Sequence, residues 1–300
     1  MPWQAALGIG PQSLWGARFG LRGVRARGRA ANPSNLTRVM PAEGAEMRAG
    51  ELPHITADLL TRLRERAPRV HCITNAVAQT FTANVLLAAG AIPSMTLSAD
   101  EIGAFVARAD ALLVNLGTFD AERRDATATA LEVAGEEGVP WVLDPVFIDR
   151  SEPRAVYAKS LVAQKPGAIR LNAGEFTALS GADPDDAALS QYALDTLAVV
   201  ALTGTVDRIT DGAHRVAIEN GHPLMAKVTA MGCAASALTG AFLAVESDPL
   251  VATASALLCF GVAGGVAGER ATGPGSFPAA LLDALYALDK TILIENARVT

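Results

Sequence analysis

Residues 227–243, KVTAMGCAASALTGAFL, contain the turn around which the rest of the chain is arranged. An extended run at 224–229 stops at small residues around Gly232, and the uncharged, Ala-rich segment that follows predicts a helix. Such a turn leaves backbone N–H groups unpaired at the positive end of a helix dipole, which predicts an anion site. Cys233 falls in the first helical turn, where the dipole should lower its thiol pKa. A small buried cysteine at a helix start is the simpler interpretation.

Short apolar runs alternate with amphipathic segments before this turn. The predicted strands are 69–74, 91–95, 111–115, 141–143, 168–171 and 197–202. The predicted helices include 56–66, 77–89, 99–109, 120–137 and 154–164. This alternation indicates an α/β fold with right-handed crossovers and a mostly parallel sheet. Runs at 207–210, 215–219 and 224–228 follow without helices, so an antiparallel edge is expected, with Asp211-Gly212 as a hairpin turn.

Two uncharged stretches after the turn, 228–245 and 249–268, approach the length of membrane spans. They are built from Ala, Gly, Ser and Thr rather than Leu, Ile and Phe, which makes membrane insertion weak. We therefore expect a buried helical hairpin with Asp248 and Pro249 in its turn, and no membrane partner.

The composition predicts one domain at 51–300 after an N-terminal extension at 1–50. Three hundred residues with 50% hydrophobic content are enough for one large core. Residues 1–42 carry six arginines and no acidic residue, so the remainder has a formal charge of −12, which argues against nucleic acid as a partner. The extension resembles a transit peptide in composition. We favour a disordered segment, or a true start at Met40 or Met47.

The cysteines indicate a reducing compartment. Their number is odd, and Cys72, Cys233 and Cys259 have no CxxC spacing. Neither a disulfide framework nor a zinc site is therefore expected. The sequence predicts a cytoplasmic location.

Polar side chains directly after the predicted strands mark the expected ligand site, because ligands of open parallel sheets bind beyond the carboxyl ends of the strands. Asp144 and Glu175 follow neighbouring strands and could share a Mg²⁺ ion, mostly through water. A helix-cap or turn role stays open for each acid. A divalent ion beside an anion site suggests phosphoryl transfer. The chain has neither GxxxxGK[ST] nor GxGxxG, which argues against ordinary P-loop and Rossmann sites.

Several blocks together resemble the hydroxyethylthiazole kinase family, a ribokinase-like family of thiamine salvage. The similarity runs from about residue 55 to 290 in HCITNAVAQTFTANVLLAAGAIPSM (71–95), NLGT (115–118), LDPV (143–146), IRLNAGEF (169–176), ALTGTVD (201–207), NGHPLMAKVT (220–229) and GPGSF (273–277). The resemblance implies a ribokinase-like three-layer sandwich. It also implies phosphorylation of the hydroxyl of 4-methyl-5-(2-hydroxyethyl)thiazole with ATP and Mg²⁺, in a homotrimer with active sites at subunit interfaces.

The resemblance also implies residue roles. The thiazole would contact Met95, Asn75 and Ala230; ATP would contact Arg170, Thr203 and Gly232; the metal would be held by Asp144 and Glu175; and Cys233 would stand where most ribokinase-like enzymes have a catalytic Asp. A thiol is a poor base near pH 7 unless its pKa is depressed, so a positioning role for Cys233 is equally open. Structural alternatives also remain for the other residues: core packing for Met95, a turn for Thr203, a surface ion pair for Arg170 and a helix cap for Asn75. His71 and His222 are expected to be structural.

Two departures from the family pattern affect the expected activity. The usual Gly-Thr-Gly-Cys turn reads Ala230-Met231-Gly232-Cys233, which should place methyl and thioether groups near the phosphates. The segment after Asp-Pro-Val is FIDRSEP (147–153) rather than Gly-rich. A kinase for a related small alcohol, or a ligand-binding or regulatory homologue with weakened turnover, therefore remains an alternative. A ribokinase-like repair dehydratase is disfavoured by the 71–95 block.

Overall fold

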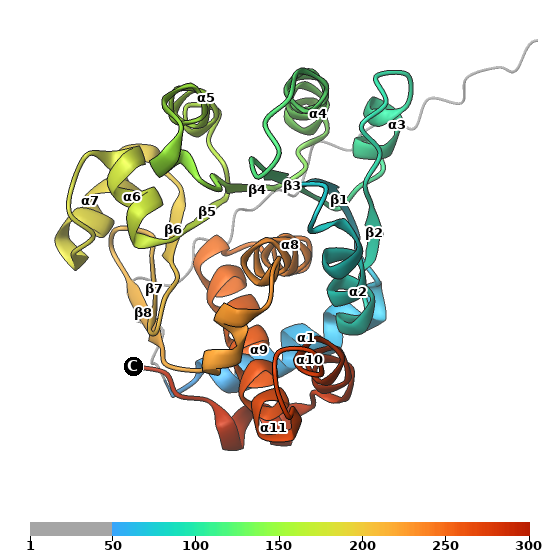
Figure 1. The fold of residues 1–300 in the computed structure, drawn as a ribbon, viewed down its shortest axis with the longest axis vertical. Coiled ribbons are helices and arrows are strands. Elements are labelled where there is room, and N and C mark those ends of the chain that lie inside the picture. Colours follow the sequence, from blue (N-terminus) through green and yellow to red (C-terminus); the bar gives the residue numbers. More distant parts are fainter. Residues whose placement is uncertain (1–49) are drawn as a thin grey trace, which may run out of the picture. The chain divides into compact units, whose positions relative to one another are not determined.

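Eight strands form one sheet in the computed structural model, which describes residues 50–300. Their order is β2-β1-β3-β4-β5-β6-β7-β8 (Figure 1). The strands are β1 Arg69–Ile73, β2 Ile92–Ser94, β3 Ala111–Asn115, β4 Trp141–Asp144, β5 Ala168–Leu171, β6 Val199–Leu202, β7 Asp207–Thr210 and β8 Arg215–Ile218. The first six are parallel, and β7 and β8 pair antiparallel. The predicted mostly parallel sheet with an antiparallel edge is confirmed.

Helices cover both faces of the sheet, as Figure 1 shows. One layer contains α1 Leu52–Arg66, α2 Gln79–Ala89, α8 Met231–Leu243, α9 Pro249–Arg270, α10 Phe277–Ala287 and α11 Lys290–Asn296. The other contains α3 Ile102–Val106, α4 Ala121–Glu137, α5 Glu152–Val162, α6 Ala173–Ser180 and α7 Asp186–Thr196. Each layer encloses its own apolar core against one sheet face. The three-layer architecture is confirmed.

The central helix α8 packs against the middle strands at Gly240, where an added Cβ atom would be in ordinary van der Waals contact with β1 and β3. A Cβ atom there would lie 3.5 Å from Val70 Cγ1 and 3.8 Å from Ala111 Cβ. The following turn is closed by Asp248, whose Oδ1 accepts hydrogen bonds from the backbone N–H groups of Leu250 and Val251 at 2.8 and 3.2 Å. The predicted helical hairpin is therefore present.

Helix α9 is the one helix in the described part of the chain that is long and apolar enough to cross a membrane. However, 83% of its most apolar 18-residue window is buried inside the protein. This burial agrees with the prediction of a core helix.

The prediction of a strand at 224–228 is wrong. Pro223–Lys227 forms a short 3₁₀ helix, η2. Pro223 cannot donate to a strand ladder, and the backbone N–H of Leu224 donates to His222 Nδ1 at 3.2 Å, which caps the turn. The C-terminal residues pair with β8 instead: the N–H of Ala217 donates to Thr300 O at 2.8 Å, and Ile218 and Val299 form an antiparallel bridge. The predicted extension at 1–50 lies, apart from Gly50, outside the described residues.

Candidate active site

The carboxyl ends of the central strands bring polar side chains to the start of α8. Asn115 ends β3 and lies in register with Asp144 at the end of β4. Asn75 follows β1, and Arg170 belongs to β5. Parallel neighbours end at the same edge of a sheet, which is why residues far apart in sequence meet here. The sequence prediction of a polar strand-end cluster is therefore correct.

Asp144 is fully buried, and its two carboxylate oxygens have different surroundings. Oδ2 accepts hydrogen bonds from Asn115 Nδ2 and Ser236 Oγ, both at 2.8 Å. Oδ1 has no hydrogen-bond partner among residues 50–300, and Arg170 Nη1 lies 3.9 Å away. Burial raises the pKa of Asp144, while Arg170, Ser236 and Asn115 act to lower it. One oxygen of a buried carboxylate is thus left without a hydrogen bond.

The guanidinium group of Arg170 lies directly against Gly232 at the start of α8. A Cβ atom on Gly232 would overlap this group, with the Arg170 Cζ only 2.9 Å away. Arg170 is therefore packed between its own strand and α8, and its Nε is buried without a partner in the described structure. The alternative of a surface ion pair is wrong, because the Arg170 side chain is only 17% exposed and its ion partner is the buried Asp144.

Glu175 forms the predicted helix cap. Its Oε2 accepts a hydrogen bond from Asn172 N at 2.9 Å, and Asn172 Oδ1 accepts one from Glu175 N at 2.9 Å, a reciprocal capping box at the start of α6. Its Oε1 also accepts from Phe147 N at 3.0 Å. Burial raises the pKa of Glu175, and the nearby Asp144 carboxylate raises it further. A cation between these two acids would relieve their repulsion.

The donor set suits Mg²⁺ that arrives with phosphate groups. No group of three or more His, Cys, Asp and Glu side chains that could hold a metal occurs within residues 50–300. Mg²⁺ needs only one or two protein carboxylates, because water and substrate phosphates complete its shell. The unpaired Asp144 Oδ1 meets that requirement. Thr74 Oγ1, also at the carboxyl edge, is likewise buried without a partner.

Cys233 lies in the first turn of α8, as predicted, but the prediction of a lowered thiol pKa is wrong. Burial, and then the charge of Asp144, raise the pKa of Cys233 to about 11. The amide groups of Asn115 and Asn75 and the charge of Arg170 act in the opposite direction without reversing this effect. Loss of hydration and a neighbouring negative charge both disfavour a thiolate. Cys233 is therefore a neutral thiol at pH 7.

Ala230 immediately precedes α8 with φ of 69°, the left-handed conformation that favours glycine. The alanine therefore holds the turn in a less favourable backbone state than the family's usual glycine would. The expectation for Met231 is wrong, because this side chain is buried with the core residues of α8 and α9. Its thioether belongs to the core rather than to the anion site.

Thr203 has the turn role that was left open. Its N–H and its hydroxyl both donate to Leu171 O, at 2.8 and 3.3 Å. The following loop is held by Asp207, whose Oδ1 accepts from Gly204 N at 3.0 Å. Burial raises the pKa of Asp207 to about 6, although the Arg170 charge acts to lower it. The sequence analysis missed Asp207, which ends the 201–207 block.

Met95 follows the edge strand β2 and packs partly against the core. Since β1 and β3 lie between β2 and β4, Met95 is roughly 14 Å from Asp144 across the sheet. Asn75 does not cap α2, whose N-cap residue is Ala78; the Asn75 Oδ1 accepts from Ala78 N at 3.0 Å in the turn that precedes the helix. The structure thus brings Asn75, Arg170, Gly232 and Cys233 to Asp144, and leaves Met95 at one side.

The two histidines have structural contacts. His71 is fully buried, with Nδ1 2.8 Å from Ser94 Oγ and Nε2 3.1 Å from Thr96 O, and burial lowers its pKa to about 4. His222 stacks on Phe277 with ring centroids 6.2 Å apart.

Sequence reasoning missed Ser236, although its position three residues after Cys233 on a helix places both on nearby faces.

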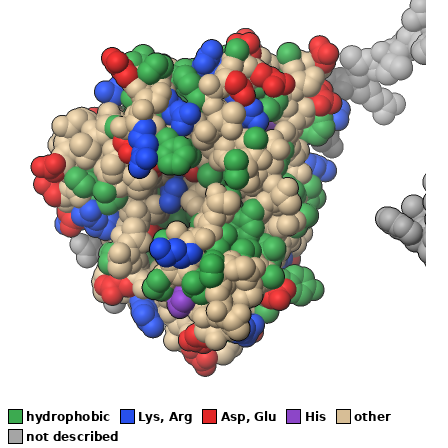
Figure 2. Space-filling model, in the orientation of Figure 1, with side chains coloured by type: hydrophobic (Ala, Val, Ile, Leu, Met, Phe, Trp, Pro, Cys, Tyr) green, Lys and Arg blue, Asp and Glu red, His purple; other side chains and the backbone are tan. Residues whose placement is uncertain are grey.

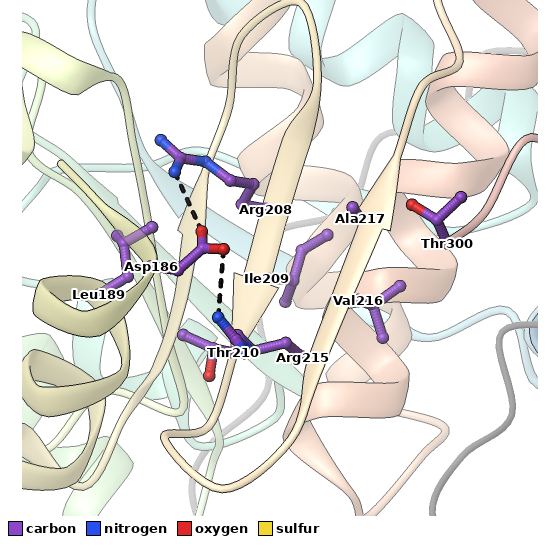
Figure 3. Close-up of a pocket in the computed structure, with 9 residues that line it drawn as sticks. All are labelled: Asp186, Leu189, Arg208, Ile209, Thr210, Arg215, Val216, Ala217 and Thr300. Carbon is purple, nitrogen blue, oxygen red and sulfur yellow. Dashed lines mark hydrogen bonds and ion pairs between the residues drawn. The ribbon is translucent and has the colours of Figure 1, made fainter.

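A separate hollow of about 280 Å³ lies between α7 and the β7–β8 hairpin (Figure 3). Asp186 joins Arg208 and Arg215 across it, at 3.0 and 3.1 Å. The hollow shares no lining residue with the Asp144 cluster.

Comparison with known proteins identifies the family of the chain. The model of the hydroxyethylthiazole kinase family matches residues 60–291. A probable hydroxyethylthiazole kinase of Agrobacterium fabrum is 46% identical over 243 residues, 81% of this chain and 94% of that protein. A hydroxyethylthiazole kinase of Granulibacter bethesdensis is 44% identical over 263 residues, 83% of this chain and 96% of its own length.

Solved structures with the same fold include a member of the same family. A hydroxyethylthiazole kinase protein from Pyrococcus horikoshii OT3 has a TM-score of 0.78 at 38% identity, covering 82% of this chain and 98% of that one. A ribokinase-like superfamily protein of Enterococcus faecalis V583 has a TM-score of 0.60 at 14% identity, covering 79% and 95%, and shares the fold. The fold is shared with a ribokinase-like protein, and the family model and relatives define a kinase of a small alcohol. Within that class, the chain belongs to the hydroxyethylthiazole kinase family.

Proposed function

We propose that this chain transfers the γ-phosphoryl group of ATP to the hydroxyl of 4-methyl-5-(2-hydroxyethyl)thiazole. The observation that carries the proposal is the buried Asp144 Oδ1, which has no hydrogen-bond partner among the described residues and lies beside Arg170 and the start of α8. The Asp144 carboxylate can bind a metal ion, and the Arg170 guanidinium and the helix N-terminus can bind the phosphate groups that the metal accompanies. The names of the relatives supply the acceptor alcohol.

The phosphates of ATP would lie at the N-terminus of α8. The guanidinium group of Arg170 adds a fixed positive charge there, and Gly232 leaves the space that this group occupies. The Thr203–Asp207 loop stands beside Arg170, because Arg170 of β5 pairs with Ala201 of β6. This loop would support the nucleotide through backbone groups, since the Thr203 hydroxyl already donates to Leu171 O.

Asp144 would hold Mg²⁺ directly through Oδ1, and Glu175 through water, because both Glu175 oxygens already accept backbone N–H groups. The ion would neutralise the phosphate oxygens as charge shifts during transfer. Arg170 adds a positive charge near the same oxygens without moving during the reaction.

The acceptor alcohol would lie on the β1–β2 side, among Met95, Asn75 and Ala230, with Cys233 next to its hydroxyl. With a pKa near 11, the Cys233 thiol does not remove the proton of the alcohol at neutral pH. Its role is to position the hydroxyl. A loose transition state requires little help from a base.

We also propose a cytoplasmic homotrimer with active sites between subunits. On the face that Figure 2 shows, hydrophobic side chains gather over the region of α2 and α10. Val77, Leu87 and Tyr286 are 72%, 57% and 77% exposed. Association would cover such apolar side chains. Light scattering at micromolar concentration tests this proposal: a trimeric mass supports it, and a monomeric mass contradicts it.

The activity is tested by ADP release in a coupled assay with the thiazole alcohol, ATP and Mg²⁺. We expect turnover that requires all three, and Asp144→Asn should reduce it at least 100-fold. Related primary alcohols in the same assay test the substrate. If ATP binds in calorimetry but no alcohol supports ADP release, the chain is a binding or regulatory homologue. The first explanation for the lost turnover would then be the left-handed backbone of Ala230 and of Phe147, which has φ of 60°.

A further inference from the structure

Asn115 occupies the centre of the polar cluster. It is 1% exposed and is the last residue of β3. Its Nδ2 donates to Asp144 Oδ2 at 2.8 Å, and its Oδ1 accepts from Asn75 Nδ2 at 3.1 Å and from Gly117 N at 3.0 Å. Reversing the amide would set donors against donors and an oxygen against a carboxylate, so its orientation is determined by its neighbours.

Two donors on separate elements hold the same oxygen of Asp144. Asn115 approaches Oδ2 from β3, and Ser236 Oγ approaches it from α8, both at 2.8 Å. Hydrogen bonds to a charged oxygen are about twice as strong as bonds between neutral groups. These two bonds therefore fix the plane of the carboxylate. Its other oxygen, Oδ1, is left without a hydrogen-bond partner among the described residues.

We infer that Asn115 is a positioning residue: together with Ser236 it orients the Asp144 carboxylate so that Oδ1 faces the metal–nucleotide. Asn115 also connects Asp144 to the acceptor side of the site through Asn75. This inference rests on the proposed phosphoryl transfer and deepens it. The connection continues from Asn75 to the Cys233 sulfur, since Asn75 Nδ2 lies 3.1 Å from both Asn115 Oδ1 and Cys233 Sγ. Gly117 is part of it, because a Cβ there would lie 2.7 Å from Asn75 Nδ2.

A variant of similar branched shape separates orientation from packing. Asn115→Leu fills the space but has neither a donor for Asp144 Oδ2 nor an acceptor for Asn75 and Gly117. If Asn115 only filled space, this variant would behave like the wild type. If it orients the carboxylate, Asn115→Leu should impair the site at least as much as Asn115→Ala.

The experiment measures binding of Mn²⁺–ADP by electron paramagnetic resonance, without the acceptor alcohol and therefore without turnover. We expect the Kd to rise about tenfold for Asn115→Ala, and at least as much for Asn115→Leu. Ser236→Ala should raise it less, since Asn115 still holds Oδ2, and the double variant Asn115→Ala, Ser236→Ala should lose more than the two single effects combined.

A matched control is Asn220→Ala at the far edge of the sheet. The Asn220 amide makes two hydrogen bonds to the backbone: its Nδ2 donates to Asn296 O at 2.7 Å, and its Oδ1 accepts from Arg298 N at 2.8 Å. The variant Asn220→Ala should lower the melting temperature and leave the Mn²⁺–ADP Kd unchanged. Should Asn115→Ala fail to fold, Asn115→Leu and Ser236→Ala carry the test.

The outcomes distinguish this inference from the proposed function. Wild-type affinity in Asn115→Leu, or additive effects in the double variant, would overturn the orienting role while leaving the kinase proposal intact. If the wild-type protein itself does not bind Mn²⁺–ADP, the proposed nucleotide site is wrong and the role of Asn115 falls with it.

Discussion

Asn75 Nδ2 donates a hydrogen bond to the sulfur of Cys233 over 3.1 Å, and so joins the segment after β1 to the first turn of α8. The sulfur acts as an acceptor in this contact, while burial and Asp144 keep its proton in place by raising the thiol pKa to about 11. A residue at the helix N-terminus that looks like an activated nucleophile from its position is thus held as a neutral group. Its chemistry follows from its neighbours rather than from the helix dipole.

The first prediction concerns Cys233→Ser. A hydroxyl can still accept from Asn75, so the variant should fold normally and lower turnover by less than about tenfold. Its pH–rate profile between pH 6 and 9 should run parallel to that of the wild type, because neither side chain titrates there. The prediction is contradicted if the wild-type rate rises with pH, with an apparent pKa in this range, and the variant lacks that rise. Cys233 would then be the base.

Cys233→Asp should be tolerated, with turnover at or above the level of the wild type. The helix N-terminus favours a carboxylate by roughly 0.3–1 kcal/mol, while burial and Asp144 would raise its pKa toward the range of an effective base. Steady-state kinetics of the two variants decide the point. Turnover of Cys233→Asp below that of Cys233→Ser would contradict this prediction.

Ala230→Gly should stabilise the protein by about 1 kcal/mol, because glycine adopts φ of 69° without the steric penalty of a Cβ. For a domain of this size, the melting temperature should rise by about 2–4 °C. Ala67→Gly is the matched control, since Ala67 is also left-handed, with φ of 45°, but ends α1 away from the site. Both changes should raise the melting temperature. Only Ala230→Gly should also change kcat/KM, and equal kinetics in the two would argue against a role for this turn.

Gly232→Ala should raise the KM for ATP and lower kcat, together reducing kcat/KM about 100-fold, because its Cβ would displace the Arg170 guanidinium. In an Arg170→Ala background the same change should have little further effect, since the overlapping group is gone. Gly135→Ala on α4 is the control, because nothing lies within 4 Å of its added Cβ. Additive losses in the double variant would mean that Gly232 acts independently of Arg170.

The buried His71 should make folding stability depend on pH. Its folded pKa of about 4 lies below the ordinary value of 6.5, so between these values the unfolded state binds a proton that the folded state does not. Its contribution is therefore complete above pH 6.5 and is lost as the pH falls toward 4, by at most about 1.4 kcal/mol per pH unit. Asp207 acts in the opposite sense, because its raised pKa favours the folded state on acidification from pH 6.

The measurement is a comparison of the free energies of unfolding of the wild type and His71→Gln between pH 7.5 and 4.5. The difference between them isolates His71 from the other titrating groups. It should shrink as the pH falls below 6.5. A constant difference would mean that His71 titrates alike in both states.

Removal of residues 1–50 should leave folding and activity unchanged. That segment is rich in arginine and shows no periodic apolar pattern, and the family match begins at residue 60. A chain that begins at Glu51 should match the full chain in soluble yield, melting temperature and kcat/KM. A large loss in any of these would show that the extension contributes to the fold or the site.

The local pattern of the sequence determined most of the architecture. Alternating apolar runs and amphipathic helices predicted the parallel sheet, and the Asp211-Gly212 turn predicted the antiparallel edge, because these features depend on neighbours within a few residues. The strand-end positions of Asn115 and Asp144 followed from the same pattern, since parallel strands end at one edge, whereas Arg170 was expected only from the family resemblance. The blocks between 71 and 277 pointed to the family.

Tertiary structure alone decided the state of the site. The raised pKa of Cys233 depends on burial and on Asp144, which is remote in sequence, and the open Oδ1 of Asp144 depends on Ser236, 92 residues away. Met231 turns into the core, and 223–227 forms a 3₁₀ helix beside α9, because packing and a missing proline N–H override the local apolar pattern. Burial and hydrogen-bond partners depend on which residues meet in space, so the spacing of residues along the chain does not predict them.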